Sequence, residues 1–405
     1  PHFPPSPTPP EPFTTSHFVQ IASLSKTIAA AFAHEYFANM GVSMNSAVNV
    51  LLRRGGSSWV VRGQGGFDGE EVTLSMLLDH TALGMHYVYG IPLSRTPPTP
   101  LQLMDGSPQG TQYGYEVLTL SRAPGQSFAY SGGGFVVLQY LLELLEERPL
   151  HQVMGPFLSR FNMGIDTFTL SQAAAPGARY AYGYVPRGEG GASKDKIDGG
   201  SGESGELGNG TGKSGLDEVQ PLAFPPLAAG CLCAPMTLAH LLVHLSCAYS
   251  CAQGSGGISH QTARAMLGRG ARKDLGSMEF MGAEIGSGVF VATAGLNRVM
   301  LHQAANDGFR GVYMLCFSGP DRGKGFVLCS NGDNPAVVFQ AEVCREVLGV
   351  NGLGFTGIDY SQWSEADLLF DIRGLKQEAI VNRGLRDLVT AAFERDEGGE
   401  GDREG

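Results

Sequence analysis

The sequence predicts an α+β protein, because helical and strand patterns occupy different parts of the chain. Long apolar stretches with helical spacing, such as 133–147 and 235–248, dominate roughly residues 30–285. From about Gly288 the pattern changes to short runs rich in β-branched and aromatic residues, separated by Gly, Asn and Asp. We therefore expect an antiparallel sheet flanked by helices, together with a mainly helical lobe.

The strand runs predict the order of the sheet segments. They read as successive antiparallel strands over 288–294, 297–305, 311–318 and 325–333. Residues 335–349 follow, and their initial proline, helical apolar spacing and closing Gly349 predict a helix lying on that sheet.

Composition shifts divide the chain into four kinds of segment. Residues 1–17 are rich in proline, and 18–348 read as one ordered domain. Within that domain, 186–220 consist largely of Gly, Ser and charged residues, which cannot bury enough apolar surface to offset their ordering entropy. We expect a flexible insertion there. Residues 349–405 form a C-terminal extension with an acidic tail, for which the sequence indicates no function.

Charge and hydropathy exclude several classes of partner. The chain has 405 residues, 42% of them hydrophobic, so it can bury a sizeable core. Its formal net charge is −11 and it has no long basic run, which argues against nucleic acid or an anionic membrane as the main partner. No apolar run reaches the roughly 20 residues that a bilayer span requires. The sequence shows no signal segment, so it leaves the localisation open.

The cysteines favour a reduced state. The chain has seven of them, an odd number, and they fall mainly in apolar segments. We therefore expect buried thiols and a reducing compartment.

Ser23 and Lys26 in IASLSKTIAA stand three residues apart at the start of a helical pattern. Almost one helical turn separates them, so the lysine could reach the serine hydroxyl. A helix-capping serine followed by a surface lysine would have the same spacing. The same Ser-x-x-Lys pattern occurs at Ser193 and Lys196 inside the predicted insertion, so spacing alone does not identify a nucleophile.

Six fragments taken together are far more specific to one family than the Ser-x-x-Lys pattern alone. They are FVQIASLSKT, VTLSMLLDHTALG, PGQSFAYSGGGFVVLQYLLE, PLAAGCLCAPMTLAHLL, HQAANDGFRG and GFVLCSNGDN. In this order and rough spacing, over about 18–348, the chain resembles the β-lactamase-related serine hydrolases. That family includes class C β-lactamases, D-Ala-D-Ala peptidases, certain esterases and the mitochondrial β-lactamase-like protein. The resemblance implies the β-lactamase/penicillin-binding-protein-like fold.

The resemblance also implies catalytic roles. Ser23 would be the nucleophile that forms an acyl-enzyme, and Lys26 would take its proton once burial has lowered the lysine pKa. Tyr130 in AYSGG matches the family's Tyr-x-Asn element and would share proton handling with Lys26. Taken alone, Tyr130 would read as a core tyrosine.

The remaining site positions are also carried over from the family. His302 in HQAAND matches Lys-Thr-Gly or His-x-Gly, and would bind substrate or orient Tyr130. The backbone N–H of Ala305 would join that of Ser23 in the oxyanion hole. Two positions depart from the family pattern: Gly132 replaces the asparagine of Tyr-x-Asn, and Ala304 replaces the glycine of the triplet. These departures put penicillin or cephalosporin turnover in doubt.

A further departure concerns the sheet. Family members place strands of the central sheet before the serine helix, whereas only a short, proline-rich segment precedes Ser23 here. We therefore expect N-terminal sheet strands to be missing or the sheet to be short on one side.

A metal site is not expected, although His240, His244, Cys247 and Cys251 resemble a zinc set. On one continuous helix the outer pair would be about 16 Å apart along the axis. Zinc bonds are about 2.0–2.3 Å long, so the four side chains could not converge on one ion. No cofactor motif is present either.

Two functions remain open from the sequence. The first is a serine hydrolase that acts through an acyl-enzyme on an ester, amide or peptide-like substrate, which the retained Ser23, Lys26 and Tyr130 support. The absence of a G-x-S-x-G motif argues against the α/β-hydrolase alternative. The second is a catalytically impaired protein of the same fold that serves as a binding or assembly module. The sequence does not determine the substrate or the oligomeric state.

Overall fold

The computed structural model describes residues 12, 14–15, 17–83, 87–164, 179–186, 216–219, 222–268, 284–294 and 296–332. Several sequence predictions lie outside these residues. They are the helix at 335–349, the C-terminal extension, most of the insertion, and the Ser193–Lys196 pair.

The helices and helical turns of the described part are η1 (Ala22–Leu24), α1 (Ser25–Asn39), α2 (Val48–Arg54), η2 (Gly69–Glu71), α3 (Leu74–Leu78), α4 (Pro108–Thr111), α5 (Gly133–Glu146), α6 (Leu150–Leu158), η3 (Ser159–Phe161), η5 (Pro226–Gly230), α7 (Pro235–Ser250) and α8 (His260–Leu267). The strands are β1 (Val19–Gln20), β2 (Ile91–Pro92), β3 (Tyr184–Pro186), β4 (Leu216–Glu218), β5 (Leu222–Ala223), β6 (Leu232–Cys233), β7 (Glu284–Ile285), β8 (Phe290–Ala294), β9 (Asn297–Asn306), β10 (Phe309–Ser318) and β11 (Gly325–Ser330).

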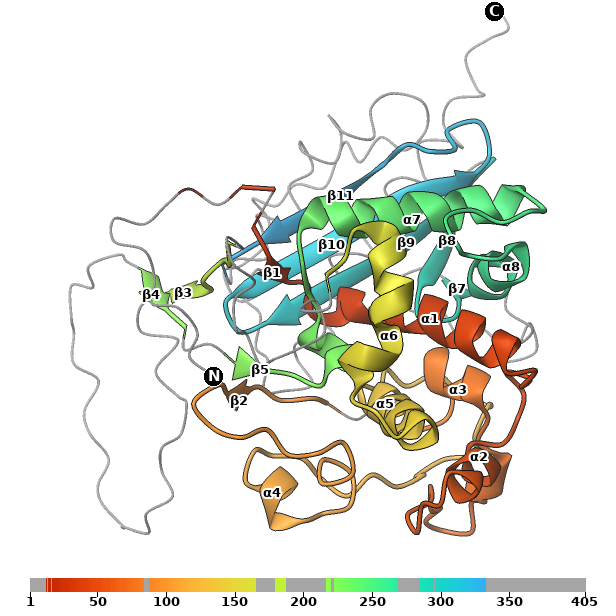
Figure 1. Cartoon of the computed structure of the whole chain (residues 1–405), viewed down its shortest axis with the longest axis vertical. Helices are drawn as coiled ribbons and strands as arrows, with labels where there is room; N and C mark the ends of the chain where they lie inside the picture. Colours follow the sequence, from red (N-terminus) through yellow and green to blue (C-terminus); the bar gives the residue numbers. More distant parts are fainter. Residues whose placement is uncertain are drawn as a thin grey trace, which may run out of the picture.

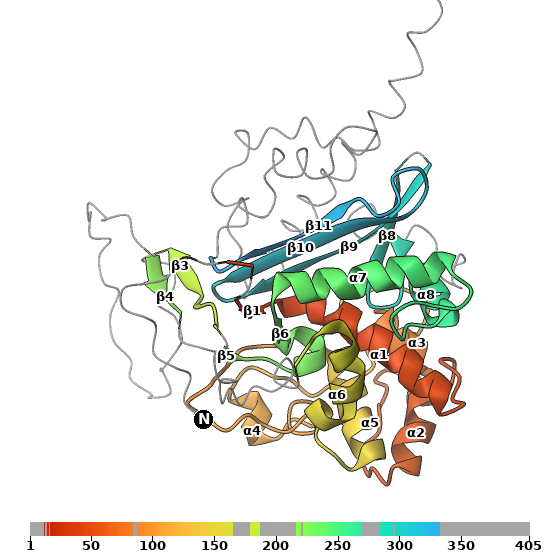
Figure 2. The same ribbon diagram turned by 45° about the horizontal axis from the view of Figure 1, so that its top comes forward.

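The main sheet has five strands in the order β11-β10-β9-β8-β7, and every neighbouring pair is antiparallel. This confirms the predicted run of strands and adds the short β7. Helices α1 and α7 lie along one face of the sheet, and α2 to α6 lie beyond them (Figures 1 and 2). The predicted α+β fold with a mainly helical lobe is therefore confirmed.

One detail of the sheet leaves part of β9 at an edge. Strand β8 pairs with residues from Asn297 to Leu301 of β9. Residues 302–306 of β9 pair with β10 on the other side. Within the described part of the chain, no strand pairs with 302–306 on the β8 side.

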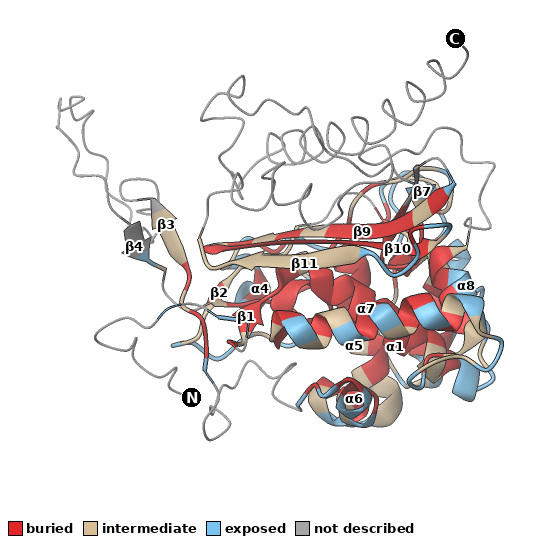
Figure 3. Cartoon of the chain, turned by 90° about the horizontal axis from the view of Figure 1, so that it is seen from above, coloured by how far each residue is buried: buried red, intermediate tan, exposed pale blue. Residues whose placement is uncertain are grey.

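Helix α1 is the central helix of the molecule. Its segment TIAAAFA combines strong helix formers with apolar side chains on every face, a pattern typical of a fully buried helix. Most of α1 is buried in Figure 3, whereas α7 alternates between buried and exposed residues. The start of α1 therefore lies deep in the protein.

Two contacts fix α1 against the sheet. Thr27 Oγ1 donates to the carbonyl oxygen of Gly288 (2.8 Å) and lies 2.7 Å from the hydroxyl oxygen of Tyr313 on β10. Gly288 has a φ of +65°, and a Cβ there would lie 2.4 Å from the Cβ of Ala30. Only glycine combines this backbone conformation with so close an approach.

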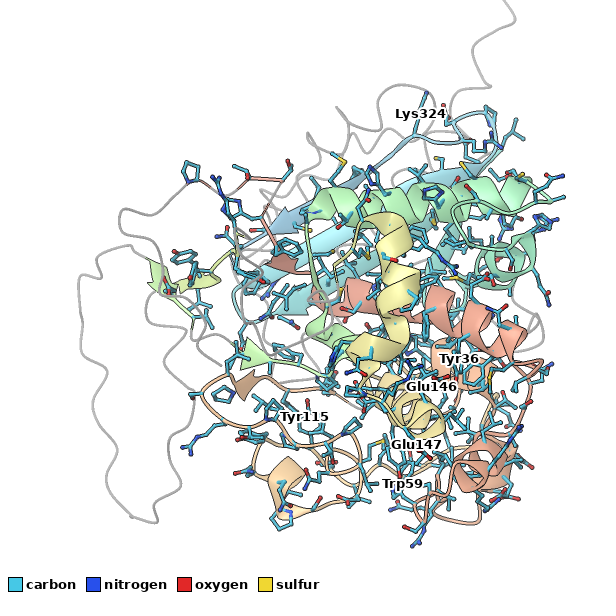
Figure 4. All side chains as sticks on the ribbon, viewed as in Figure 1. Tyr36, Trp59, Tyr115, Glu146, Glu147 and Lys324 are labelled. Carbon is cyan, nitrogen blue, oxygen red and sulfur yellow. The ribbon has the colours of Figure 1, made fainter. Side chains whose placement is uncertain are left out.

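The helical lobe is tied to α1 from the other side. The hydroxyl of Tyr36 on α1 donates to the carboxylate of Glu146 at the end of α5 (2.8 Å), and Figure 4 shows both side chains. Trp59 and Tyr140 form an edge-to-face pair with ring centroids 6.1 Å apart. Together these contacts hold α5 against α1 and against the loop that follows α2.

Smaller ladders account for the remaining strands. The segment just before Ser23 forms β1, which pairs with β6 rather than with the main sheet. Strand β4 pairs with β3, so residues 216–218, which the sequence assigns to the flexible insertion, belong to a two-stranded ladder.

Candidate active site

Ser23 and Lys26 lie in consecutive elements at the start of the central helix. The sequence predicts one α-helix from about Ala22, whereas the structure has the tighter turn η1 followed by α1. Ser23 lies in η1 and is half-buried. Its Oγ lies 3.0 Å from Lys26 Nζ. The structure therefore brings the two side chains to hydrogen-bonding distance, as the motif predicts.

The serine is not a helix cap. The N-cap residues of η1 and α1 are Ile21 and Leu24, and neither makes a capping side-chain hydrogen bond. A different serine has a structural role, since Ser25 Oγ accepts from the N–H of Cys231 (3.0 Å). Ala22, directly before Ser23, has a φ of +44°, which is strained for a residue with a Cβ. The turn thus presents the Ser23 hydroxyl to Lys26 instead of to the backbone.

Lys26 is 1% exposed, which is unusual for a lysine. Its Nζ lies 2.7 Å from the carbonyl oxygen of Ala228 in η5. Burial disfavours the charged ammonium and lowers the pKa of Lys26 from 10.5 to about 7. A substantial fraction of this lysine is therefore neutral near pH 7 and has a lone pair that can accept a proton.

Tyr130 lies beside the same amine. Its ring centroid is 4.8 Å from Lys26 Nζ. Tyr130 stands directly before Ser131 and Gly132, and Gly132 is the buried N-cap residue of α5. The segment just before α5 thus places the Tyr130 ring beside the start of α1.

His302 lies on β9 and approaches Tyr130 from the sheet. It is 1% exposed and stands opposite Tyr313 in the β9–β10 ladder. Its ring centroid lies 6.2 Å from that of Tyr130. Nδ1 donates to the carbonyl oxygen of Gln303 (2.6 Å), which leaves Nε2 as a buried acceptor without a hydrogen-bond partner in the described part of the chain. Burial, with a smaller contribution from the charge of Lys26, lowers the pKa of His302 to about 3, so the ring is neutral.

The two alanines of HQAAND occupy the edge of β9. Ala304 is 6% exposed and stands opposite Gly311 of β10. A Cβ on Gly311 would lie 3.2 Å from Leu24, so this glycine lets η1 lie against the sheet. Ala305 is half-buried and belongs to the part of β9 that β8 does not pair. The residues predicted from the sequence therefore come from η1, α1, the start of α5 and β9.

Sequence reasoning did not assign a role to His80, Phe290 or Ala228. The His80 ring lies 4.4 Å from the Tyr130 ring, and the Phe290 ring lies 5.1 Å from His302. His80 belongs to the fragment LLDHTALG, which contributed to the resemblance, but spacing along the chain gave no reason to place it at the site. The Ala228 contact is a backbone carbonyl, for which residue identity carries no signal.

The residues considered for zinc lie elsewhere. His240, His244 and Cys247 are on α7, with Cys251 at its C-cap. Nδ1 of His244 lies 3.0 Å from Ser255 Oγ, and its ring packs on Phe161. In the described ranges no group of three or more His, Cys, Asp or Glu side chains could hold a metal ion.

The described cysteines are free thiols. Cys231, Cys233 and Cys316 are buried as expected, but Cys247 is exposed because it lies on the outer face of α7.

No helix in the described ranges is both long and apolar enough to cross a membrane.

Comparisons with known proteins identify the family of the chain and related folds. The model of the β-lactamase family matches residues 6–345. A search of curated proteins gives no match. The chain is thus related in sequence to a family of hydrolases over most of its length.

Solved structures share the fold at low sequence identity. A D-amino acid amidase from Ochrobactrum anthropi SV3, complexed with D-phenylalanine, has a TM-score of 0.56 at 12% identity, over 96% of this chain and 88% of that one. A D-stereospecific amidohydrolase from Streptomyces sp. has a TM-score of 0.51 at 16% identity, over 78% and 83%. A penicillin-binding protein from Bacillus halodurans has a TM-score of 0.52 at 14% identity, over 80% and 84%.

Proposed function

The chain belongs to the β-lactamase family, and from this premise we propose that it is a serine hydrolase that works through an acyl-enzyme. The observation that carries the proposal is the contact between Ser23 Oγ and the buried Lys26 Nζ at 3.0 Å. A serine hydroxyl is a weak nucleophile at neutral pH and needs an adjacent base. A lysine with a pKa of about 7 is such a base.

The proposed reaction begins with proton transfer from Ser23 to the neutral amine of Lys26. Ser23 Oγ attacks the carbonyl carbon of the substrate, and the electron pair of the carbonyl moves to its oxygen. As the tetrahedral intermediate collapses, the bond to the leaving group breaks and the leaving group takes up a proton. Water then repeats the sequence on the acyl-enzyme and releases the acid.

Tyr130 is proposed to pass the proton between Lys26 and the leaving group through its hydroxyl, and the distance of 4.8 Å from its ring centroid to Lys26 Nζ supports this role. His302 is proposed to contact the substrate through its unpartnered Nε2, which can accept a hydrogen bond. Its low pKa keeps the ring neutral, so it does not compete with Lys26 for the proton.

The oxyanion would be stabilised by the backbone N–H groups of Ser23 and Ala305. Residues 302–306 of β9 lack a neighbour on one side within the described ranges, so an extended substrate could lie along them as an added strand. This edge fits a peptide-like or amide substrate as well as a simple ester.

Two residues influence which class of substrate the site accepts. Gly132 offers no side-chain amide, and Ala304 adds a buried methyl where the family pattern has glycine. Both features disfavour β-lactam turnover. Two of the similar structures are described as an amidase and an amidohydrolase, which adds weight to an amide substrate.

The experiment is intact-mass analysis after exposure to a serine-reactive fluorophosphonate. We expect one equivalent of adduct at Ser23, because only an activated hydroxyl reacts quickly, and no adduct with Ser23→Ala. Ser25→Ala is the matched control, since Ser25 belongs to the same segment but bonds to backbone. A folded protein without an adduct, or with adducts spread over many serines, would favour the binding or assembly module instead.

A further inference from the structure

We propose that His80 is a positioning residue that fixes Tyr130 against Lys26. His80 follows directly after the end of α3 at Asp79. Its carbonyl oxygen accepts from the N–H of Ala129 (2.9 Å), and its Nδ1 accepts from the N–H of Ser131 (3.1 Å). One residue therefore holds the backbone on both sides of Tyr130. The inference rests on the proposed role of Tyr130 in proton transfer.

The imidazole also holds the side chain of Tyr130. The centroids of the two rings lie 4.4 Å apart, and the ring planes are tilted by 32°. The rings of Phe128 and Phe135 lie 5.8 and 5.6 Å from His80 and hold it in turn. Aromatic contacts of this kind restrict ring orientation as well as bury surface.

The backbone of His80 has an uncommon conformation that contacts with neighbouring residues maintain. Its φ of +59° lies in the left-handed region, which is uncommon for residues other than glycine, although histidine, asparagine and aspartate adopt it more often than most. Such a conformation persists only where the surrounding contacts compensate for its strain. Here the compensating contacts are the two hydrogen bonds to the segment that carries Tyr130.

The imidazole can accept from Ser131 only if Nδ1 is unprotonated. Burial, followed by the charges of Lys26 and His302, lowers the pKa of His80 well below its ordinary value, so the ring is neutral at pH 7. A neutral ring adds no charge beside Lys26. It can therefore orient Tyr130 without changing the basicity of the amine.

The test compares His80→Gly with His80→Asn. Both residues tolerate a positive φ, so backbone strain does not separate them. Glycine removes the acceptor for Ser131, whereas the asparagine carbonyl can replace it. We expect kcat for a neutral activated ester to fall about 10–100-fold in His80→Gly, with little change in KM, because a misplaced catalytic group costs rate. His80→Asn should recover most of that loss.

A second readout does not depend on hydrolysis. Nitration of Tyr130 by tetranitromethane, resolved by peptide mass, should be faster in His80→Gly than in wild type and slow again in His80→Asn. His34→Asn is the matched control, because His34 is also buried and makes a side-chain hydrogen bond, to Ser287, away from Tyr130. If the space left by glycine prevents folding, His80→Leu fills it without an acceptor. Its comparison is then His80→Gln, which has an acceptor and the same backbone strain at a positive φ.

The outcomes separate this inference from the proposed function. If wild type forms no adduct at Ser23, the proposed function is wrong, and nitration alone then decides the role of His80. If wild type is active, the inference stands only when the fall in kcat, its recovery by asparagine and the faster nitration occur together. Unchanged kcat or unchanged nitration in the folded glycine variant overturns it, as does an equal loss in His34→Asn.

Discussion

Lys26 Nζ lies 2.7 Å from the carbonyl oxygen of Ala228, a residue 202 positions further along the chain. This contact shows how the fold produces a buried amine. Helix α1 places Lys26 in the interior, and η5 closes over it and supplies a neutral acceptor. A carbonyl oxygen does not neutralise the ammonium charge as a carboxylate would, so desolvation dominates and the pKa falls.

The first prediction concerns the identity of the base. Lys26→Arg keeps a cationic side chain, but a guanidinium does not release its proton near neutral pH. We expect ester hydrolysis to fall by about 10²–10⁴-fold. Lys324→Arg is the control, because Lys324 lies in the β10–β11 turn at the periphery of the sheet (Figure 4) and pairs with Asp321. If Lys26→Arg stays active while Ser23→Ala is inactive, Ser23 is the nucleophile and Tyr130 becomes the leading candidate for its base.

The second prediction concerns the pH dependence of the rate. Only the neutral amine accepts the serine proton, and the pKa of Lys26 is about 7. The value of kcat/KM should therefore rise with pH and reach half its maximum near pH 7. The pKa of His302 is about 3, so this histidine does not titrate in that range. A rate that is flat from pH 5.5 to 8.5, measured with a non-ionisable ester, would contradict the assignment.

The third prediction concerns stability. Because the folded pKa of Lys26 is about 7 and its ordinary value is 10.5, the unfolded chain binds the extra proton between these pH values. Wild-type stability should therefore rise with pH across that window. Lys26→Met carries no proton and should be more stable than wild type by on the order of 3 kcal/mol at pH 7, although inactive.

Denaturant unfolding at several pH values checks this prediction. The advantage of Lys26→Met should shrink steadily as the pH rises from 7 towards 10. An advantage that is independent of pH would mean that Lys26 is not desolvated in the folded protein.

The fourth prediction separates function from folding at His302. Its buried Nε2 lacks a partner in the described part of the chain, and such a group costs about 1–3 kcal/mol. His302→Phe keeps a ring of similar size, but it removes both the unpartnered Nε2 and the Nδ1–H that donates to the carbonyl oxygen of Gln303. The two effects oppose each other, so the free energy of unfolding should change by less than about 1 kcal/mol. If the substrate uses Nε2, kcat/KM should fall about tenfold at the same time. A folded variant that keeps full activity would show that Nε2 does not bind the substrate.

The fifth prediction concerns the Gly/Ser-rich insertion. The pairing of Tyr184 with Glu218 brings the two ends of this segment together, so residues 190–213 can be replaced by a short Gly-Ser linker that leaves β3 and β4 intact. From its composition, we expect the melting temperature to change by less than about 2 °C. A drop of many degrees in a thermal melt would show instead that the insertion is packed structure.

The sequence by itself determined the α+β order of elements, the four long strands of the sheet and the pairing of Ser23 with Lys26. Each of these depends on residues close together in the chain. Alternating and helical apolar patterns are local, and so is the reach from Ser23 to Lys26 across one turn. Local patterns missed the 3₁₀ turn at Ser23 and the strand β4, and β4 forms by pairing with β3, about 30 residues earlier in the chain.

Only the tertiary structure determined that Lys26 is buried and that its pKa is lowered. A lysine three residues after a serine is an ordinary surface residue unless other segments exclude water from it. Here η5, the start of α5 and β9 do so, and they bring Ala228, Tyr130 and His302 to the same place. His80 joins them through contacts to Ala129 and Ser131 that no spacing in the sequence encodes. The pKa of an amine depends on its solvation, and solvation is a property of the folded whole.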